Sequence, residues 1–173
     1  MQDFSNGTID LDTLPKYEEV QFNPLSAKYW NVVVVNLSIF LLCVAIGLVL
    51  LLISTEELGP YLYVSAGSYV AFAAFLFVVY KASVKRRGFA LREKDLIYKS
   101  GIIALSTTII PFSRIQHISL DEGVVSRFYK LGKLQIFTAG GSSGSLHISG
   151  LDIEQAKTIK EILMKQINQA DQP

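Results

Sequence analysis

Two long runs of apolar residues dominate the first half of the chain. Residues 31–53 and 61–80 contain no acidic or basic side chain and few polar ones. At a helical rise of ~1.5 Å per residue, each run is roughly as long as the ~30 Å hydrocarbon core of a bilayer is thick. The polar segment 54–60 between them ends in Gly-Pro, which is a turn signal. The pattern therefore predicts a two-helix transmembrane hairpin within residues 30–80.

The charges that flank these runs indicate how the hairpin is oriented. Lysine and arginine residues cluster directly after the second run, at 81–87, whereas the connecting segment carries Glu56 and Glu57 and no basic residue. Segments rich in Lys and Arg stay on the cytoplasmic side of a membrane. The sequence thus predicts a multi-pass protein of the cell (inner, cytoplasmic) membrane with both termini in the cytoplasm.

Behind the second run the spacing of apolar residues changes to two. Alternation around Ile118, Ile136 and Ile148 and the β-branched run 102–110 are typical of short strands joined by tight turns. Only the last segment has a helical stripe, and it follows Asp152, a residue type that caps helix N-termini. Short strands followed by one amphipathic helix favour a small antiparallel barrel or a pair of sheets that the helix covers.

An ordered set of short motifs lies in this β-rich half. Residues 98–101 are Y-K-S-G, residues 110–116 are I-P-F-S-R-I-Q, and residues 127–141 fit R-x-x-x-x-G, a strand and T-A-G-G. Together with the hairpin, the set resembles the bacterial pleckstrin-homology (PH-like) membrane protein family, YdbS-like group. The resemblance covers about residues 88–168. It implies a PH-like fold of about seven strands with a C-terminal helix, and it implies no characterised reaction.

The predicted fold class is an α+β membrane protein. It consists of a two-helix transmembrane hairpin followed by a PH-like antiparallel β-barrel or sandwich with a C-terminal helix. The predicted parts are an acidic cytoplasmic N-terminal tail at 1–29, the hairpin at 30–80, a basic juxtamembrane linker at 81–87 and a cytoplasmic PH-like domain at 88–169.

Charge becomes informative when it is counted by region. The whole chain has 16 basic and 15 acidic side chains, a balance that suggests no nucleic-acid partner. Residues 1–29 carry 2 basic and 5 acidic side chains, whereas the part from residue 81 onward carries 14 basic and 8 acidic. These basic residues can simply fix the topology, or they can also bind anionic lipid. The candidate headgroup contacts are Lys81, Lys85, Arg86, Arg87 and Arg92.

The sequence contains no recognisable catalytic or metal-binding constellation. The single cysteine, Cys43, cannot form an intrachain disulfide, and His117 and His147 have no acidic or cysteine neighbours at metal-ligand spacing. The Gly- and Ser-rich segment 140–145 lacks the lysine of a phosphate loop. We therefore expect a protein that is not an enzyme, with no catalytic residues, no metal or other cofactor and no small-molecule substrate.

Two further groups of residues are candidates for packing or partner contacts. Arg114 follows Pro111 at a turn, where a guanidinium can bond backbone carbonyls, or instead meet a phosphate or a partner carboxylate, and Gln116 is similarly ambiguous. Within the spans, small residues and an amide favour close packing of helices. These span residues are Asn36, Gly47, Gly67 and Ala71.

Three functions remain open at this point. The favoured one is a non-enzymatic membrane protein whose PH-like domain serves as an assembly or adaptor module. The family resemblance suggests another membrane protein of the same family as partner, or self-association. The second is an anionic-lipid sensor, and the third is an accessory subunit of a transporter, which is disfavoured because the spans lack ionisable groups.

Overall fold

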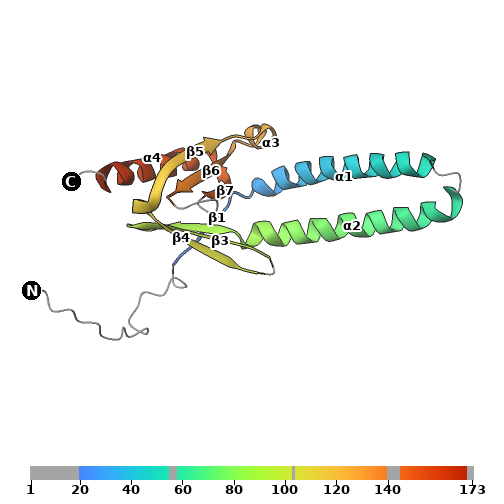
Figure 1. Ribbon diagram of the computed structural model, residues 1–173, viewed down its shortest axis with the longest axis horizontal. Helices are drawn as coiled ribbons and strands as arrows, with labels where there is room; N and C mark the ends of the chain where they lie inside the picture. The colour runs from blue at the N-terminus through green and yellow to red at the C-terminus, as the bar shows by residue number, and fades with distance from the viewer. Residues whose placement is uncertain (1–19, 55–57, 103, 140–144, 171–173) are drawn as a thin grey trace, which may run out of the picture.

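Two antiparallel helices extend from a small β-sandwich (Figure 1). The computed structural model describes residues 20–54, 58–102, 104–139 and 145–170. Helix α1 (Tyr29–Ser54) and helix α2 (Leu58–Arg86) form the hairpin, and both are long and apolar enough to cross a membrane. The two long apolar helices that the uncharged runs predicted are therefore confirmed.

Both helices extend beyond the predicted spans. Helix α2 begins at Leu58, so Gly59 and Pro60 lie in its first turn, where the missing N–H of proline breaks no helical hydrogen bond. The turn at 54–60 is therefore shorter than predicted. At the other end, α2 continues to Arg86, so the expected linker at 81–87 is almost entirely helical. Basic side chains in this last turn suit the negative end of the helix dipole.

The sandwich consists of two antiparallel sheets. The first sheet has the strand order β1-β2-β3-β4 and the second has the order β5-β6-β7. A short 3-10 helix, η3 (Phe112–Arg114), carries the chain from one sheet to the other. The sheets do not close into a barrel, so the sandwich is confirmed as the form of the PH-like fold. The strands are β1 (Asn23–Pro24), β2 (Gly88–Leu91), β3 (Asp95–Ser100), β4 (Ser106–Pro111), β5 (Ile115–Asp121), β6 (Leu131–Thr138) and β7 (Ser145–Asp152).

Helix α4 (Ile153–Ala170) packs on the sandwich through one apolar stripe. Ala156 and Leu163 are fully buried in it, in the same core cluster as residues of both sheets. The Asp152 carboxylate accepts a hydrogen bond from the Glu154 N–H at 3.3 Å, which is the N-cap that the sequence predicted. A second short helix, α3 (Val124–Phe128), lies between β5 and β6 and was not predicted.

Residues 20–28 are part of the sandwich. Strand β1 pairs with β2, the Leu25 side chain is buried in the core, and the Ser26 N–H donates to the Gly150 carbonyl at 2.9 Å. The sequence assigned these residues to a separate tail at 1–29, and residues 1–19 of that tail lie outside the described residues. The chain therefore passes from the first sheet directly into α1.

The two long helices leave most of their surface uncovered. The buried residues of α1 are Val32, Leu37, Leu41 and Leu52, and in residues 61–86 of α2 only Ser83 is buried. A polar contact joins the helices at mid-length, where the Tyr69 hydroxyl donates to the Leu41 carbonyl at 3.0 Å. Such long, exposed apolar surfaces suit contact with lipid or with other membrane helices.

Candidate functional site

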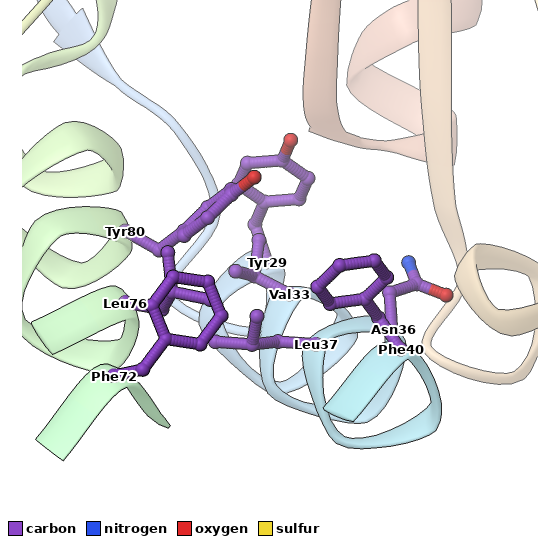
Figure 2. A pocket seen from close by; sticks show the side chains of 8 residues that line it. All are labelled: Tyr29, Val33, Asn36, Leu37, Phe40, Phe72, Leu76 and Tyr80. Carbon is purple, nitrogen blue, oxygen red and sulfur yellow. The ribbon is translucent and has the colours of Figure 1, made fainter. Parts of the chain in front are cut away.

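An apolar groove separates α1 from α2 in the half of the hairpin next to the sandwich (Figure 2). Its volume is about 470 Å³, and Figure 2 shows side chains of both helices meeting around it. Aromatic residues stand on both walls, and Asn36 contributes the only amide. The lining residues are Tyr29, Val33, Asn36, Leu37, Phe40, Phe72, Leu76 and Tyr80.

Asn36 has no hydrogen-bond partner among the described residues, and its side chain is exposed. An amide in an apolar membrane environment is costly unless another group bonds it, and the usual partner lies on a neighbouring helix. Within this hairpin Tyr69, and not Asn36, donates a hydrogen bond to the other helix. The amide of Asn36 is therefore available to a group outside the hairpin.

The other small residues expected to pack the helices face outward. Gly47, Gly67 and Ala71 are exposed, and a Cβ added at Gly47 or Gly67 would meet no atom within 4 Å. These residues therefore do not form the contact between α1 and α2. They leave open space at Gly47 and Gly67 where another helix could approach closely.

A cationic hollow of about 380 Å³ lies where α2 enters the first sheet. It brings Lys85, Arg86 and Arg87 of the basic cluster next to Lys99 of β3. The Lys99 ammonium also lies 5.7 Å from the centre of the Phe22 ring. Lys81 is exposed on α2 and does not line the hollow. The fold thus places Lys99 of β3 against the basic residues that end α2.

The arginines near this hollow differ in how they are bound. Arg86 donates from Nη1 to the Ile102 carbonyl, and Arg87 donates from Nη2 to the Ser83 hydroxyl at 3.2 Å. The Arg87 Nε is buried without a partner. Burial raises the pKa of the Tyr98 phenol, and the nearby Arg87 guanidinium partly offsets that rise. The Arg87 side chain therefore packs and bonds where α2 meets the sandwich, and it is less available to a lipid headgroup than its neighbours.

Arg92 lies apart from the hollow and is already paired. Its guanidinium donates from Nε to Asp95 Oδ1 at 2.6 Å and from Nη2 to the other carboxylate oxygen. This bond to Asp95 raises the pKa of Arg92. The pair spans the β2–β3 turn, so the structure gives Arg92 a local partner and does not group it with the other candidate headgroup contacts.

The residues of the I-P-F-S-R-I-Q motif form the crossover between the two sheets. The Arg114 carbonyl accepts from the Ala139 N–H at 3.0 Å, whereas its guanidinium is exposed and has no hydrogen bond within the described ranges. Pro111 ends β4, and Gln116 is the extra residue at an irregularity in the β5–β6 register. The motif therefore shapes the backbone here, and a hollow of about 270 Å³ beside Arg114 stays open.

The remaining polar candidates have ordinary surroundings. His117 and His147 are exposed, and the His117 ring lies 5.7 Å from that of Phe137. The Asp121 carboxylate accepts hydrogen bonds from Ser119, at 2.9 Å, and from Gln135. Within the described part of the chain, no three His, Cys, Asp or Glu side chains are grouped to hold a metal. The glycine-rich segment 140–144 lies outside the described residues.

Sequence reasoning missed the groove as a site. Tyr29 and Tyr80 were visible only as aromatic residues at span ends, a position typical of interfacial anchors. Phe40 and Phe72 carry no signal of their own within uniformly apolar runs. These four side chains line one groove because α1 and α2 lie side by side and run antiparallel (Figure 1).

The apolar hairpin and the two-sheet sandwich covered by α4 together define a membrane protein with a PH-like domain. The chain belongs to the bacterial PH domain family, whose family model matches residues 32–167 and so includes most of both parts. No solved structure gives a significant match.

Two curated relatives come from Bacillus subtilis (strain 168). UPF0699 transmembrane protein YdbT is 33% identical over 94 residues, which are 53% of this chain and 19% of the relative. UPF0699 transmembrane protein YdbS is 25% identical over 91 residues, which are 52% of this chain and 55% of the relative. The matches therefore span about a fifth of one relative and about half of the other, and neither name points to catalysis.

Proposed function

We propose that this protein is a non-enzymatic assembly module of the cell membrane. The hairpin crosses the membrane twice, the PH-like domain lies in the cytoplasm, and the groove between α1 and α2 receives a helix of another membrane protein of the same family. The observation that carries this proposal is the unpartnered Asn36 amide, which lies at the rim of an otherwise apolar groove and points away from α2 (Figure 2).

The chemistry of the hairpin supports a helix as the occupant of the groove. A hydrogen bond from a neighbouring helix to an amide such as Asn36 contributes about 0.6–2 kcal/mol in a membrane. The aromatic and aliphatic walls offer the van der Waals contact that drives helix association in lipid. The outward faces at Gly47 and Gly67 add two places for close approach. Together these surfaces suit a larger helical assembly better than a lone hairpin.

The orientation and the family support the same proposal. The basic residues from Lys81 to Arg87 favour a cytoplasmic position for the sandwich. Both relatives are called transmembrane proteins, and the matched stretch is only 19% of one of them. Related membrane proteins of different length thus occur in one bacterium, which fits assembly between family members.

Co-purification tests this proposal. The full chain would be isolated from its native host in mild detergent, and co-eluting proteins would be identified by mass spectrometry. We expect a stoichiometric membrane protein of the bacterial PH domain family with the wild type, and its loss with Asn36→Leu. Asn31→Leu is the matched control, because Asn31 is exposed on α1 and does not line the groove. Recovery of a lone monomer, or an unchanged complex with Asn36→Leu, would contradict the proposal.

The cationic hollow supports anionic-lipid binding as a second function. Lys85, Arg86 and Lys99 lie together at the end of the span, where each basic group contributes about 1 kcal/mol of attraction to an anionic surface. Native mass spectrometry of the full chain from mixed-lipid nanodiscs would identify retained lipids. We expect anionic lipid to be retained, and to be lost in a Lys85→Gln, Lys99→Gln variant but not in Lys165→Gln. Equal retention of zwitterionic lipid would exclude this function.

A further inference from the structure

The short helix α3 carries the two most exposed large apolar side chains of the described sandwich. Val124 is 80% exposed and Phe128 is 84% exposed, whereas the next such residue of the sandwich, Leu105, is 57% exposed. Val124 and Phe128 are four residues apart in the helix and therefore share one face. A patch of this kind on a small domain marks a contact surface.

The position of α3 indicates what this patch contacts. Helix α3 touches α1, and it lies at the end of the sandwich from which the two long helices extend (Figure 1). In Figure 2 the amide of Asn36, in the second turn of α1, points toward the tan ribbon. This ribbon has the colour of the segment that contains α3 in Figure 1. The patch therefore lies beside the first turns of α1.

The length of α1 sets the depth of α3 relative to the bilayer. Helix α1 has 26 residues and is about 39 Å long, some 9 Å more than the ~30 Å hydrocarbon core. The exposed polar residues Lys28 and Asn31 place part of this excess at the sandwich end of α1, so a segment beside its first turn lies at the boundary between headgroups and acyl chains. This boundary is where short amphipathic helices bury an apolar face by about 5–10 Å.

The charges around the patch fit the same boundary. Arg127, which shares the face of Val124 and Phe128, is exposed, and so is Lys130 directly after the helix. Long basic side chains can keep their stems in the apolar layer while their charges reach the lipid phosphates. On the other side of the hairpin, exposed Leu105 borders the cationic hollow, so both flanks present apolar and basic groups together.

We propose that α3 is a membrane-interface wedge. Val124 and Phe128 insert into the leaflet that α1 enters, Arg127 and Lys130 lie among the phosphates, and the sandwich is thereby held against the bilayer in one orientation. This wedge acts without a protein partner, so it goes beyond the proposed assembly function and does not depend on it.

Depth-dependent quenching tests the wedge. The full chain, with Cys43→Ala as background, would carry an environment-sensitive fluorophore at Phe128→Cys, and a control chain would carry it at Met164→Cys on α4. Met164 is an exposed apolar residue of α4, which lies at the end of the sandwich away from the long helices in Figure 1. Each chain would be placed singly in nanodiscs that contain lipids spin-labelled in the headgroup or along the acyl chain.

We expect the label at residue 128 to emit at shorter wavelength and to be quenched several-fold more strongly by spin-labelled lipid than the label at residue 164. Quenching should be strongest for spin labels near the top of the acyl chain. Emission typical of water with no lipid quenching would overturn the proposal. A blue-shifted label that spin-labelled lipid does not quench would also overturn it, because the patch would then be covered by protein.

Discussion

Gly150 joins the sandwich to α1, and its replacement by alanine tests that joint. The residue has φ +84°, and a Cβ there would lie 2.3 Å from Tyr29 Cγ and 2.6 Å from Tyr29 Cδ2. A side chain in the left-handed region costs roughly 1–2 kcal/mol, and the overlap with the Tyr29 ring costs about 1–3 kcal/mol. We therefore expect Gly150→Ala to lower the free energy of unfolding by about 2–5 kcal/mol.

Denaturant unfolding of the full chain in detergent, followed by circular dichroism, measures this loss. A double variant with Tyr29→Ala separates the two causes, because removing the ring relieves the overlap and leaves the backbone strain. The two substitutions should therefore couple by about 1–3 kcal/mol. Gly123→Ala is the control, since its Cβ would meet only the Ser126 hydroxyl at 3.7 Å. Two results would refute this reasoning. One is an unfolding midpoint of Gly150→Ala equal to that of the wild type, and the other is a double variant in which the two losses of free energy of unfolding simply add.

Two further predictions concern the sandwich. The Leu163 side chain on α4 is fully buried. We therefore expect Leu163→Ala to lower the free energy of unfolding, measured by denaturant titration, by about 2–5 kcal/mol. A decrease below about 1 kcal/mol would contradict the described packing. Burial raises the pKa of Tyr98 above its usual 10.0, so the folded state keeps the phenolic proton to higher pH than the unfolded chain. This stabilisation is present below pH 10 and is lost as pH rises through the folded pKa. Wild type should therefore lose stability above pH 10 more steeply than Tyr98→Phe, and identical alkaline melting profiles would show that Tyr98 does not carry the effect.

The elements that could be predicted from the sequence are those whose signal is local and long. The charge-free runs predicted α1 and α2 because a membrane span needs only length and apolarity. Helix α4 was predictable because Asp152 caps it and an apolar stripe follows. Period-two alternation indicated β5, β6 and β7, but it does not determine whether two sheets close into a barrel.

The features that were missed depend on short segments or on contacts between distant residues. Helix α3 has only five residues, starts with two valines, and follows Gly123 without a side-chain cap. Strand β1 has two residues, one of them Pro24, so it carries no strand pattern. The groove and the cationic hollow arise from residues far apart in the chain, such as Tyr29 with Tyr80 and Lys85 with Lys99. The Arg92–Asp95 pair could have been found from its three-residue spacing.

Photo-crosslinking from inside the groove in living cells of the native host tests the assembly proposal most directly. A photoreactive amino acid would replace Phe40, which lines the groove, and in a control chain Leu42, which is 60% exposed on α1 and does not line it. We expect residue 40 to form a covalent adduct with a membrane protein of the bacterial PH domain family, and residue 42 to form no such adduct. Adducts of residue 40 with lipid alone, under conditions in which the chain is correctly inserted, would contradict the claim that the groove receives a helix.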